Sequence, residues 1–336
     1  MSLSSTTENS ESQLTVREIE NSDIHTGIRT IDPRILNLSY SSLLELHSCP
    51  RKLELSRLGS ISETGETQEE SITFSYGQVV GLGIQLSLER KSYEEIIWQM
   101  FLGWKPELFA DNPKQNKSFD AAVYAVQKFR AMCDSGYLQD YELVYYNGKP
   151  ACELSFLINL PGGFKYRGFV DAVLRHVVTG KVIVLECKTS SALNLNPATY
   201  KNSAQAIGYS IVLDAIFPEL SSYSVIYLVY GTKSLQYDQF EFTKSYVQRA
   251  RWIRELVLDC STIELYHEND LYPMRGESCF SYFRECKYMG LCQMDTSRLV
   301  PKPSPTLQLE IDKANSKYEI TISLDDLINS QLSKVS

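Results

Sequence analysis

The chain has 336 residues, of which 43% are hydrophobic and 22% are charged, as in an ordinary folded globular protein. It is long enough to bury a sizeable core without disulfides, and no stretch approaches the about 20 consecutive apolar residues that span a bilayer. The net charge of −8 excludes a general attraction to nucleic acid, so a nucleic-acid surface requires a local basic patch or carboxylates bridged to phosphate by metal ions.

The two ends of the chain differ in composition from the middle. Residues 1–33 are rich in Ser, Thr, Asn and Glu and are expected to form a disordered head. They lack the apolar run of a secretory signal, which indicates an intracellular, cytoplasmic protein. Residues 299–336 are expected to form a linker and a C-terminal tail with one strand, at 317–323. The folded domain is therefore predicted at 34–298.

The first part of this domain is predicted to be helical. Ser39 is of the N-cap type and precedes leucines at helical spacing, and Pro50 interrupts that helix directly after Cys49. The helix predicted at 75–90 carries small residues on one side, which suit close packing. Two more helices are predicted, at 92–104 and 119–132.

From residue 142 the apolar pattern changes to the period of strands, with turn signals between the runs. Helices, then a mostly antiparallel sheet, then further helices predict an α/β or α+β domain with a central sheet. The predicted strands are 142–148, 151–160, 164–176, 181–188, 223–231 and 235–243, and the predicted helices of this part are 198–216 and 244–267.

Two charged residues stand at the end of the apolar strand VIVLECK. Side chains alternate along a strand, so Glu186 and Lys188 are expected on one face and Cys187 on the other. A two-residue hairpin loop at Thr179–Gly180 would place Asp171 opposite Lys188 and Val173 opposite Glu186. Asp171, Glu186 and Lys188 are then predicted to converge on one patch.

Such a patch has two interpretations. Two carboxylates, a backbone carbonyl and waters form a hard oxygen site for Mg²⁺ or Mn²⁺, with Lys188 placed to orient a water or to stabilise developing charge. The alternative is a structural Asp–Lys–Glu cluster at the edge of the sheet. Lys201, Gln205 and Tyr209 recur every four residues in the following helix and would form one stripe. That stripe either contacts a nucleotide or phosphate or is a partly exposed helix face.

These residues form an ordered set of motifs. Gly168-Phe-Val-Asp171, Glu186-Cys-Lys188 and Gln205-x-x-x-Tyr209 resemble the GxxD, (D/E)xK and QxxxY motifs of the RecB-like exonuclease branch of the PD-(D/E)xK nucleases. The resemblance implies an α/β, restriction-endonuclease-like core with a central mixed sheet flanked by helices. It implies that Asp171, Glu186 and the carbonyl of Cys187 bind the metal and that Lys188 is the catalytic lysine. It also implies that Gln205 and Tyr209 contact the substrate, together with Lys201 from the same stripe. Glu153 stands where the branch often has a further acidic residue.

One position departs from that branch. RecB-like enzymes usually carry a histidine metal ligand on an early helix, about four residues after a glycine, but the corresponding segment here reads Gly77-Gln-Val-Val-Gly81. Gln85, one turn later, is the residue that could replace the missing imidazole.

The eight cysteines include a group near the end of the chain. Cys279, Cys286 and Cys292 need a fourth ligand to complete a metal site, and Cys49 in HSCPRK is the candidate. AddB and the CRISPR-associated RecB-like exonucleases are similar: one cysteine before the nuclease core and three after it hold a 4Fe-4S cluster. The resemblance therefore implies an iron–sulfur cluster that closes the domain, with zinc or incidental cysteines as the alternatives.

Basic and aromatic residues are interleaved in the last part of the domain. This pattern suits the backbone and bases of single-stranded DNA, although an ordinary solvated helix face has the same composition. The residues are Lys244, Arg249, Trp252, Arg251 and Arg254 in the long helix, and Arg275, Tyr282, Phe283, Arg284 and Lys287 after it.

The resemblance implies a metal-dependent DNA exonuclease, of the kind that phages use, which hydrolyses phosphodiesters with a metal-activated water. Its expected role is the processing of DNA ends in recombination, replication or repair, in the host cytoplasm if the protein is from a phage. Its expected partners are DNA and a protein such as an annealing protein or helicase, and no membrane is expected. A non-catalytic DNA-binding scaffold and a structure-specific endonuclease are the two alternatives.

Overall fold

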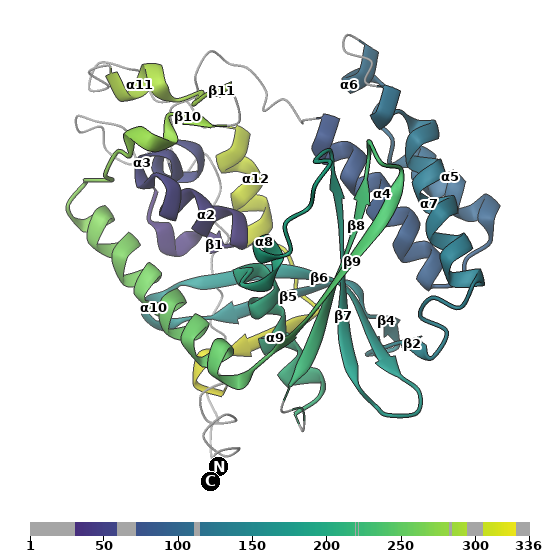
Figure 1. Cartoon of the computed structure of the whole chain (residues 1–336). Helices are drawn as coiled ribbons and strands as arrows, with labels where there is room; N and C mark the ends of the chain where they lie inside the picture. The colour runs from purple at the N-terminus through teal and green to yellow at the C-terminus, as the bar shows by residue number, and fades with distance from the viewer. Residues whose placement is uncertain are drawn as a thin grey trace, which may run out of the picture. The chain divides into compact units, whose positions relative to one another are not determined.

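The computed structural model describes residues 31–58, 72–110, 115–218, 220, 222–281, 284–293 and 305–326 (Figure 1). Most of the predicted head and the start of the predicted linker lie outside these residues. The chain divides into two compact units. The described residues of the first unit come from Met1–Gln68, Gly162–Lys165 and Ser261–Lys317, and those of the second come from Glu69–Pro161, Tyr166–Cys260 and Tyr318–Ser336.

The second unit is built on a mixed β-sheet in the strand order β12-β5-β6-β7-β8-β9. β12 with β5 and β7 with β8 run parallel, whereas β6 with β7 and β8 with β9 run antiparallel. The predicted mixed sheet flanked by helices is confirmed. β2 also pairs with β6, whereas β3 and β4 pair with each other in a separate sheet. The strands of the unit are β2 Tyr141–Leu143, β3 Tyr145–Tyr146, β4 Lys149–Pro150, β5 Cys152–Asn159, β6 Lys165–His176, β7 Val182–Ser190, β8 Tyr223–Gly231, β9 Gln236–Lys244 and β12 Ile320–Ser323.

Helices α4 (Ile72–Leu88), α5 (Tyr93–Leu102) and α7 (Phe119–Asp134) cover one face of this sheet (Figure 1). Their apolar residues form one core with alternate strand residues such as Ile183 and Leu185. The small residues predicted for close packing serve this purpose, because a Cβ on Gly83 of α4 would lie 2.4 Å from the Val126 side chain of α7.

Helices α9 (Ala204–Ile216) and α10 (Tyr246–Glu268) begin on the other face. The ring of Tyr209 on α9 meets that of Phe156 on β5 edge-on at 6.5 Å, and Trp252 on α10 packs against Tyr166 on β6 at 5.3 Å. The single helix predicted at 198–216 is wrong. It is divided into α8 (Ala198–Lys201) and α9, because Ser203 has the extended ψ of 121°.

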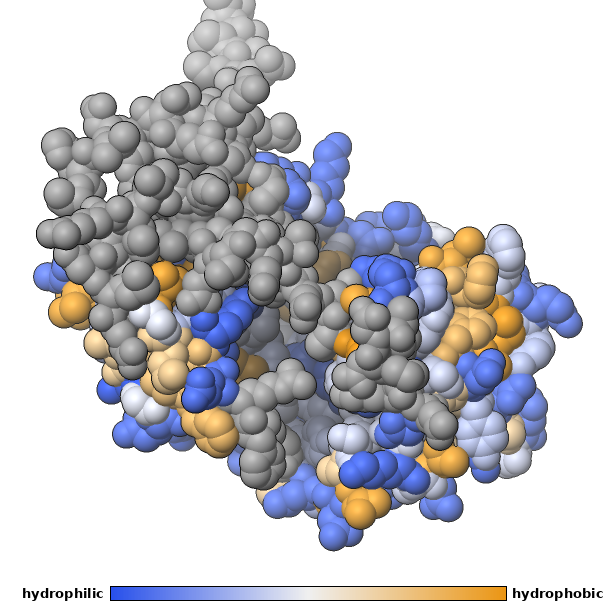
Figure 2. Space-filling view, turned by 90° about the horizontal axis from the view of Figure 1, so that it is seen from above, coloured by the Kyte–Doolittle hydropathy of each residue, from blue (hydrophilic) through white to orange (hydrophobic). Residues whose placement is uncertain are grey.

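The surface of the second unit includes an exposed apolar stripe. In Figure 2 hydrophobic side chains gather at the right of the view, on the side where α5 lies in Figure 1. Helix α5 buries Ile96 and Met100 but leaves Trp98, Phe101 and Leu102 more than half exposed. Among the helices in the described parts of the chain, none is long and apolar enough to cross a membrane.

The first unit is mostly helical. Ser39 caps α2 with the predicted hydrogen bond to a backbone N–H and completes a capping box with Ser42, and α2 ends before Cys49 and Pro50 as expected. Its elements are η1 Pro33–Ile35, β1 Asn37–Leu38, α2 Tyr40–Ser48, α3 Pro50–Leu53, the π-helical turn η2 Glu54–Leu58, η5 Gly276–Ser278, β10 Phe280–Ser281, β11 Arg284–Glu285, α11 Met289–Gln293 and α12 Pro305–Ala314, with the last residues of α10.

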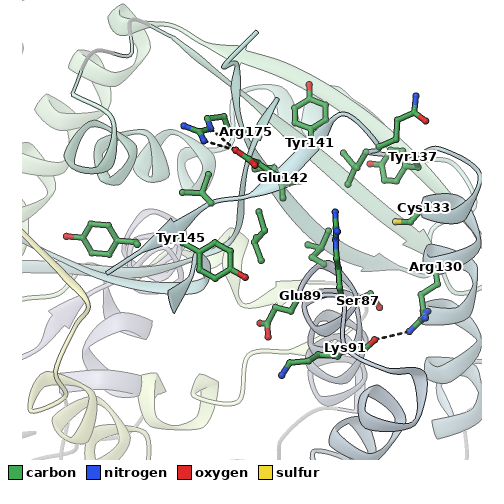
Figure 3. Close-up of a pocket in the computed structure, with 18 of the residues that line it drawn as sticks. Ser87, Glu89, Lys91, Arg130, Cys133, Tyr137, Tyr141, Glu142, Tyr145 and Arg175 are labelled. Carbon is green, nitrogen blue, oxygen red and sulfur yellow. Dashed lines mark hydrogen bonds and ion pairs between the residues drawn. The ribbon is translucent and has the colours of Figure 1, made fainter. Parts of the chain in front are cut away.

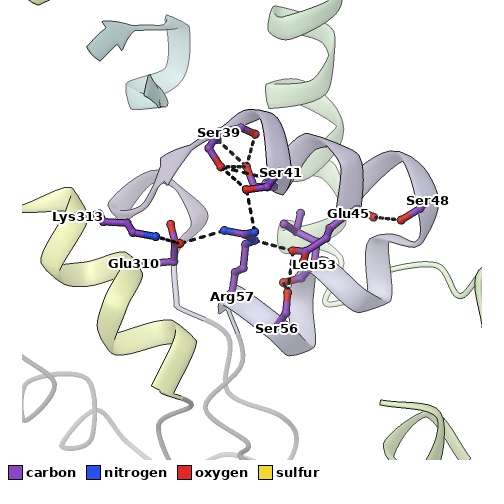
Figure 4. Close-up of polar contacts among 10 residues, drawn as sticks. Ser39, Ser41, Glu45, Ser48, Leu53, Ser56, Arg57, Glu310 and Lys313 are labelled. Atoms are coloured by element: carbon purple, nitrogen blue, oxygen red, sulfur yellow. Dashed lines mark hydrogen bonds and ion pairs between the residues drawn. The ribbon is translucent and has the colours of Figure 1, made fainter. Parts of the chain in front are cut away.

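A charged network joins distant segments of this unit (Figure 4). The guanidinium of Arg57 donates to Glu45 Oε2 at 2.6 Å and to Glu310 Oε1 at 3.0 Å, and Lys313 also pairs with Glu310. Glu310 lies on α12, a helix that the sequence patterns did not predict in the tail. Ile31, from the segment expected to be a disordered head, is buried and bonded through its N–H to the carbonyl of Leu58.

Candidate active site

Asp171, Glu186 and Lys188 lie together in the second unit, as the sequence predicts. Glu186 is fully buried on β7, and its Oε1 is 2.5 Å from Nζ of Lys188 two residues later on the same face. On the neighbouring strand β6, Oδ2 of Asp171 accepts a hydrogen bond of 2.9 Å from the backbone N–H of Cys187. The side chain of Cys187 packs into the core on the opposite face.

The predicted register of this hairpin is wrong by two residues. Val173 lies opposite Val184, not Glu186, and continuing the ladder brings Asp171 level with Glu186 instead of Lys188. The reason is the loop: the N–H of His176 bonds to the carbonyl of Lys181, so four residues form the turn where two were expected. A shift of two residues keeps every side chain on its predicted face, so the patch survives the error.

The carboxylates of this patch repel one another. Burial, followed by the charge of Glu186 and then that of Glu153, raises the pKa of Asp171 well above its ordinary value. Burial and the charge of Glu186 also raise the pKa of Glu153. Glu153 has a left-handed φ of 49° inside β5, a conformation that costs free energy in a non-glycine residue and is often found at functional sites. The site thus favours the binding of a cation.

Lys188 provides a fixed positive charge beside these carboxylates. Burial lowers the pKa of Lys188, but the charges of Glu186 and Asp171 outweigh burial, and the pKa rises above its ordinary value. Lys188 is therefore an ammonium group at neutral pH and not a proton acceptor. Its Nζ also donates to Oε1 of Gln205 at 3.3 Å, and Nε2 of Gln205 donates to the Tyr209 hydroxyl at 2.5 Å.

The structure joins Gln205 and Tyr209 to the patch but separates Lys201 from them. The predicted stripe of three residues is wrong at Lys201, because the break at Ser203 places Lys201 on α8, where its side chain is exposed.

Gln85 is also not brought to the patch. It lies on α4, which packs on the opposite face of the sheet, and its amide donates to Glu89 at 3.1 Å.

The donor set of the patch suits a hard divalent cation. Within the described parts of the chain, no three His, Cys, Asp or Glu side chains gather closely enough to enclose a metal ion. Two carboxylates are nevertheless sufficient for Mg²⁺, which usually keeps several waters. Both oxygens of Glu186 are buried; Oε1 is paired with the Lys188 ammonium, and the Tyr209 hydroxyl also interacts with this carboxylate. A buried carboxylate beside Asp171 fits a metal ligand.

The four cysteines predicted as ligands are neighbours in the first unit. The β10–β11 hairpin sets Cys279 and Cys286 opposite each other, with the N–H of Cys286 bonded to the carbonyl of Cys279 at 2.7 Å. Burial raises the pKa of the Cys292 thiol, Arg51 lowers it, and Cys286, Cys49 and Cys279 raise it further. All four are free thiols.

The basic residues predicted to contact DNA have different positions. The prediction is wrong for Arg249, whose guanidinium is fully buried and pairs with Asp214 at 2.9 Å. Trp252 is buried as well, and Lys244 is fully buried and donates to the carbonyl of Lys201 at 2.6 Å. Arg251, Arg254 and Arg275 are exposed, Lys287 lies over the Tyr288 ring, and Tyr282 and Phe283 are outside the described residues.

An open cavity of about 1030 Å³ lies in the same unit, away from the carboxylate patch (Figure 3). Its walls come from the ends of α4 and α7 and from β2 and β3, and neither Asp171, Glu186 nor Lys188 lines it. Its charges are largely paired: Arg175 bonds to Glu142 at 2.6 Å, and Arg130 donates to the carbonyl of Lys91. The size of this cavity therefore does not identify it as the active site.

One residue beside the patch was missed by the sequence patterns. Tyr200 on α8 packs over Tyr227 and Phe240 and lies within the electrostatic reach of Lys188. It belongs to no motif and follows a loop, so no periodicity marks it. The only signal in the sequence is that Tyr200 is aromatic and directly precedes Lys201.

Comparison with known proteins identifies a family for this chain. The family model of the PD-(D/E)XK nuclease superfamily matches residues 37–293. Among curated proteins, none matches this chain. A solved structure of a candidate exonuclease from Eubacterium rectale is similar over 87% of this chain and 99% of its own, with 14% identity and a TM-score of 0.43. The structure of SSO0001 is similar over 61% of this chain and 79% of its own, with 18% identity and a TM-score of 0.26.

The family match covers most of the chain and contains each of the three motifs at the patch. Proteins of this superfamily act on DNA and generally use Mg²⁺ or a similar divalent metal. The chain belongs to the PD-(D/E)XK nuclease superfamily.

Proposed function

We propose that this protein is a metal-dependent DNA exonuclease whose catalytic residues are Asp171, Glu186 and Lys188. The observation that carries the proposal is the placement of two carboxylates and an ammonium group on one face of β6 and β7, with Lys188 Nζ 2.5 Å from Glu186 Oε1. This arrangement brings a cation-binding group and a phosphate-binding charge together.

Asp171 and Glu186 would hold Mg²⁺ or Mn²⁺, with the Cys187 carbonyl as a further ligand and Glu153 close enough to contribute charge. The bound ion would supply a water of lowered pKa and neutralise charge on the phosphate. Gln85 contributes no ligand in this proposal, because it lies on the other face of the sheet and bonds to Glu89.

The side chains around the metal ligands have separable roles. The hydrogen bond from the Cys187 N–H fixes the Asp171 carboxylate beside Glu186. The Lys188 ammonium, held between Glu186 and Gln205, stabilises the negative charge that develops on the phosphate during hydrolysis. The Tyr209 hydroxyl accepts a hydrogen bond from Gln205 and orients it, and Gln205 in turn positions Lys188.

The assignment as an exonuclease rests on the order of the motifs GxxD, ExK and QxxxY. The proposed role is the processing of DNA ends in recombination, replication or repair, as in phage enzymes of this type, with an annealing protein or helicase as partner. Lys201, exposed on α8, is available to contact a DNA phosphate. A DNA substrate and free cysteines both suit the cytoplasm.

Linear and closed circular DNA distinguish the proposed activity from its alternatives. With Mg²⁺ or Mn²⁺, an exonuclease degrades end-labelled linear DNA and leaves a covalently closed circle of the same sequence intact. Cutting of the circle would identify an endonuclease. Binding of linear DNA without cleavage under either metal would identify a non-catalytic scaffold.

We propose in addition that Cys49, Cys279, Cys286 and Cys292 hold a 4Fe-4S cluster. The proposal is supported by the proximity of the four thiols in the first unit and by their order along the chain, one before the nuclease motifs and three after them. Anaerobically purified protein should contain iron and acid-labile sulfide in equal amounts, and Cys286→Ser should lose both. Cys133→Ser, outside the group, is the matched control. Zinc without sulfide would contradict the proposal.

A further inference from the structure

An aromatic surface continues directly from the carboxylate patch across the sheet. In the strand register, Glu186 on β7 is the partner of Tyr227 on β8, and Tyr227 is the partner of Phe240 on β9. Partner residues in a sheet project to the same face, so Tyr227 and Phe240 form a row that begins at the buried carboxylate.

Tyr200 lies over this row. Its ring stacks on Phe240 with centroids 5.6 Å apart and an interplanar angle of 14°, and it packs on Tyr227 at 4.9 Å and 40°. Tyr200 therefore contacts both members of this row. It is nevertheless only partly buried, so part of its side chain remains exposed.

The short helix that carries Tyr200 is anchored to the sheet. Nζ of Lys244, at the end of β9, donates to the backbone carbonyl of Lys201 at 2.6 Å, and Lys244 is fully buried. A cation at the carbonyl end of α8 holds this single turn in place. The ring of Tyr200 is thus fixed before substrate arrives, which lowers the entropic cost of stacking on it.

Tyr200 is also close to the residues that the proposed reaction uses. Burial raises the pKa of the Tyr200 hydroxyl and the positive charge of Lys188 lowers it, so the two side chains are electrostatic neighbours. A phosphate at Lys188 would thus bring an adjoining nucleobase toward the exposed part of Tyr200.

We propose that Tyr200 stacks on the nucleobase next to the phosphate that is cut, and that the substrate is single-stranded at this nucleotide. The inference rests on the proposed function of Asp171, Glu186 and Lys188. A base inside a duplex is already stacked on its neighbours, so only an unpaired or frayed nucleotide can use the ring. Stacking on an aromatic side chain tolerates any base, as a nuclease that degrades unspecified sequence requires.

Base stacking is measured by binding, separately from cleavage. The affinity for a single-stranded oligonucleotide is determined with Ca²⁺ in place of Mg²⁺, for intact DNA and for a series with one abasic site moved through the terminal nucleotides. The proteins are wild type, Tyr200→Leu, Tyr200→Phe and, as the matched control, Tyr145→Leu, which removes an exposed tyrosine of β3 that lines the separate cavity of Figure 3.

The expected result is that Tyr200→Leu weakens binding of intact DNA about 10-fold, as for the loss of one stacked base. Tyr200→Phe and Tyr145→Leu should bind like wild type. When the abasic site occupies the stacked position, wild type should bind this DNA about 10-fold more weakly than intact DNA. Tyr200→Leu should bind the two DNAs equally. If Tyr200→Leu weakens binding by the same factor whichever nucleotide is abasic, the residue has a structural role and the stacking proposal is wrong. An unchanged affinity of Tyr200→Leu for intact DNA would also overturn the proposal.

The two proposals fail in different ways. If wild type degrades DNA with Mg²⁺ while Tyr200→Leu binds intact and abasic DNA like wild type, the stacking proposal is wrong and the nuclease proposal stands. If the abasic pattern is found but no protein cleaves DNA, Tyr200 stacks on a nucleobase but no cut phosphate lies beside it, and the nuclease proposal is wrong.

Discussion

Gly168 on β6 lies so close to Phe156 on β5 that a Cβ added to the glycine would be 2.5 Å from the aromatic ring. The same ring meets Tyr209 edge-on at 6.5 Å, and Tyr209 bonds to Gln205. The glycine of the GxxD motif therefore has a packing role: it leaves room for the ring that supports the tyrosine of the QxxxY motif.

Gly168→Ala is expected to destabilise the protein by about 1–3 kcal/mol, because the Phe156 ring must move to admit the methyl group. Urea unfolding measures the change in the free energy of unfolding. Gly81→Ala on α4 is the matched control. A Cβ there meets no atom within 4 Å, so alanine should stabilise the helix by up to about 1 kcal/mol. Phe156→Leu should restore stability to Gly168→Ala, and a failure to do so would contradict this packing account.

Asp214→Ala is expected to destabilise the protein by about 3–5 kcal/mol, because it leaves the fully buried guanidinium of Arg249 without its carboxylate. The exposed pair of Arg251 and Glu255 on the same helix provides the control, and Glu255→Ala should cost less than about 1 kcal/mol. Similar losses of stability in Asp214→Ala and Glu255→Ala would show that Arg249 reaches solvent. It could then contact DNA, as the sequence suggests.

Replacement of Lys244 should change how stability depends on pH. Burial lowers the pKa of Lys244 to about 8 from the usual 10.5, so between these values the unfolded chain binds more protons than the folded one. The stability of wild type relative to Lys244→Met should therefore rise from pH 8 to about 10.5 and stay constant below pH 8. Lys233→Met, at an exposed lysine, is the matched control. If the difference in stability between wild type and Lys244→Met does not change with pH, the Lys244 amine is hydrated in the folded protein.

Mg²⁺ should raise the melting temperature of wild type, because it binds the folded patch and not the unfolded chain; a concentration of 100 times Kd stabilises by about 2.7 kcal/mol. Asp171→Asn should abolish this shift. It should also stabilise the metal-free protein, because it removes one of the crowded carboxylates. Glu142→Gln, at an exposed carboxylate, should respond to Mg²⁺ like wild type. If Mg²⁺ raises the melting temperature of Asp171→Asn as much as that of wild type, the metal binds elsewhere.

The sequence predicts the side-chain faces of this site better than its registers. Glu186 and Lys188 share a face because they are two apart on a strand, and that rule holds whatever the neighbouring strand does. The partner of each residue depends on the length of the Val177–Gly180 turn, which the apolar pattern does not specify. The prediction consequently found the patch and missed its register.

Long-range partners explain the other differences. Nothing local distinguishes Arg249, which is buried against Asp214 thirty-five residues earlier, from the exposed Arg251 beside it. The tail strand was recognised by its alternation, but its parallel pairing with β5 joins residues more than 160 positions apart. Tyr200 gains its place from a contact between β9 and α8 that no periodicity records.

The central claim is that Lys188 acts with Asp171 and Glu186 in cutting DNA, and the rate of phosphodiester cleavage tests it most directly. End-labelled linear single-stranded DNA is incubated with Mg²⁺ and with wild type, Lys188→Ala or Lys181→Ala, the last removing an exposed lysine that precedes the same strand. The account predicts that Lys188→Ala lowers the rate about 10²–10³-fold, as for loss of a group that stabilises transition-state charge, while Lys181→Ala cleaves like wild type. Equal rates for wild type and Lys188→Ala, or no cleavage by wild type, would contradict it.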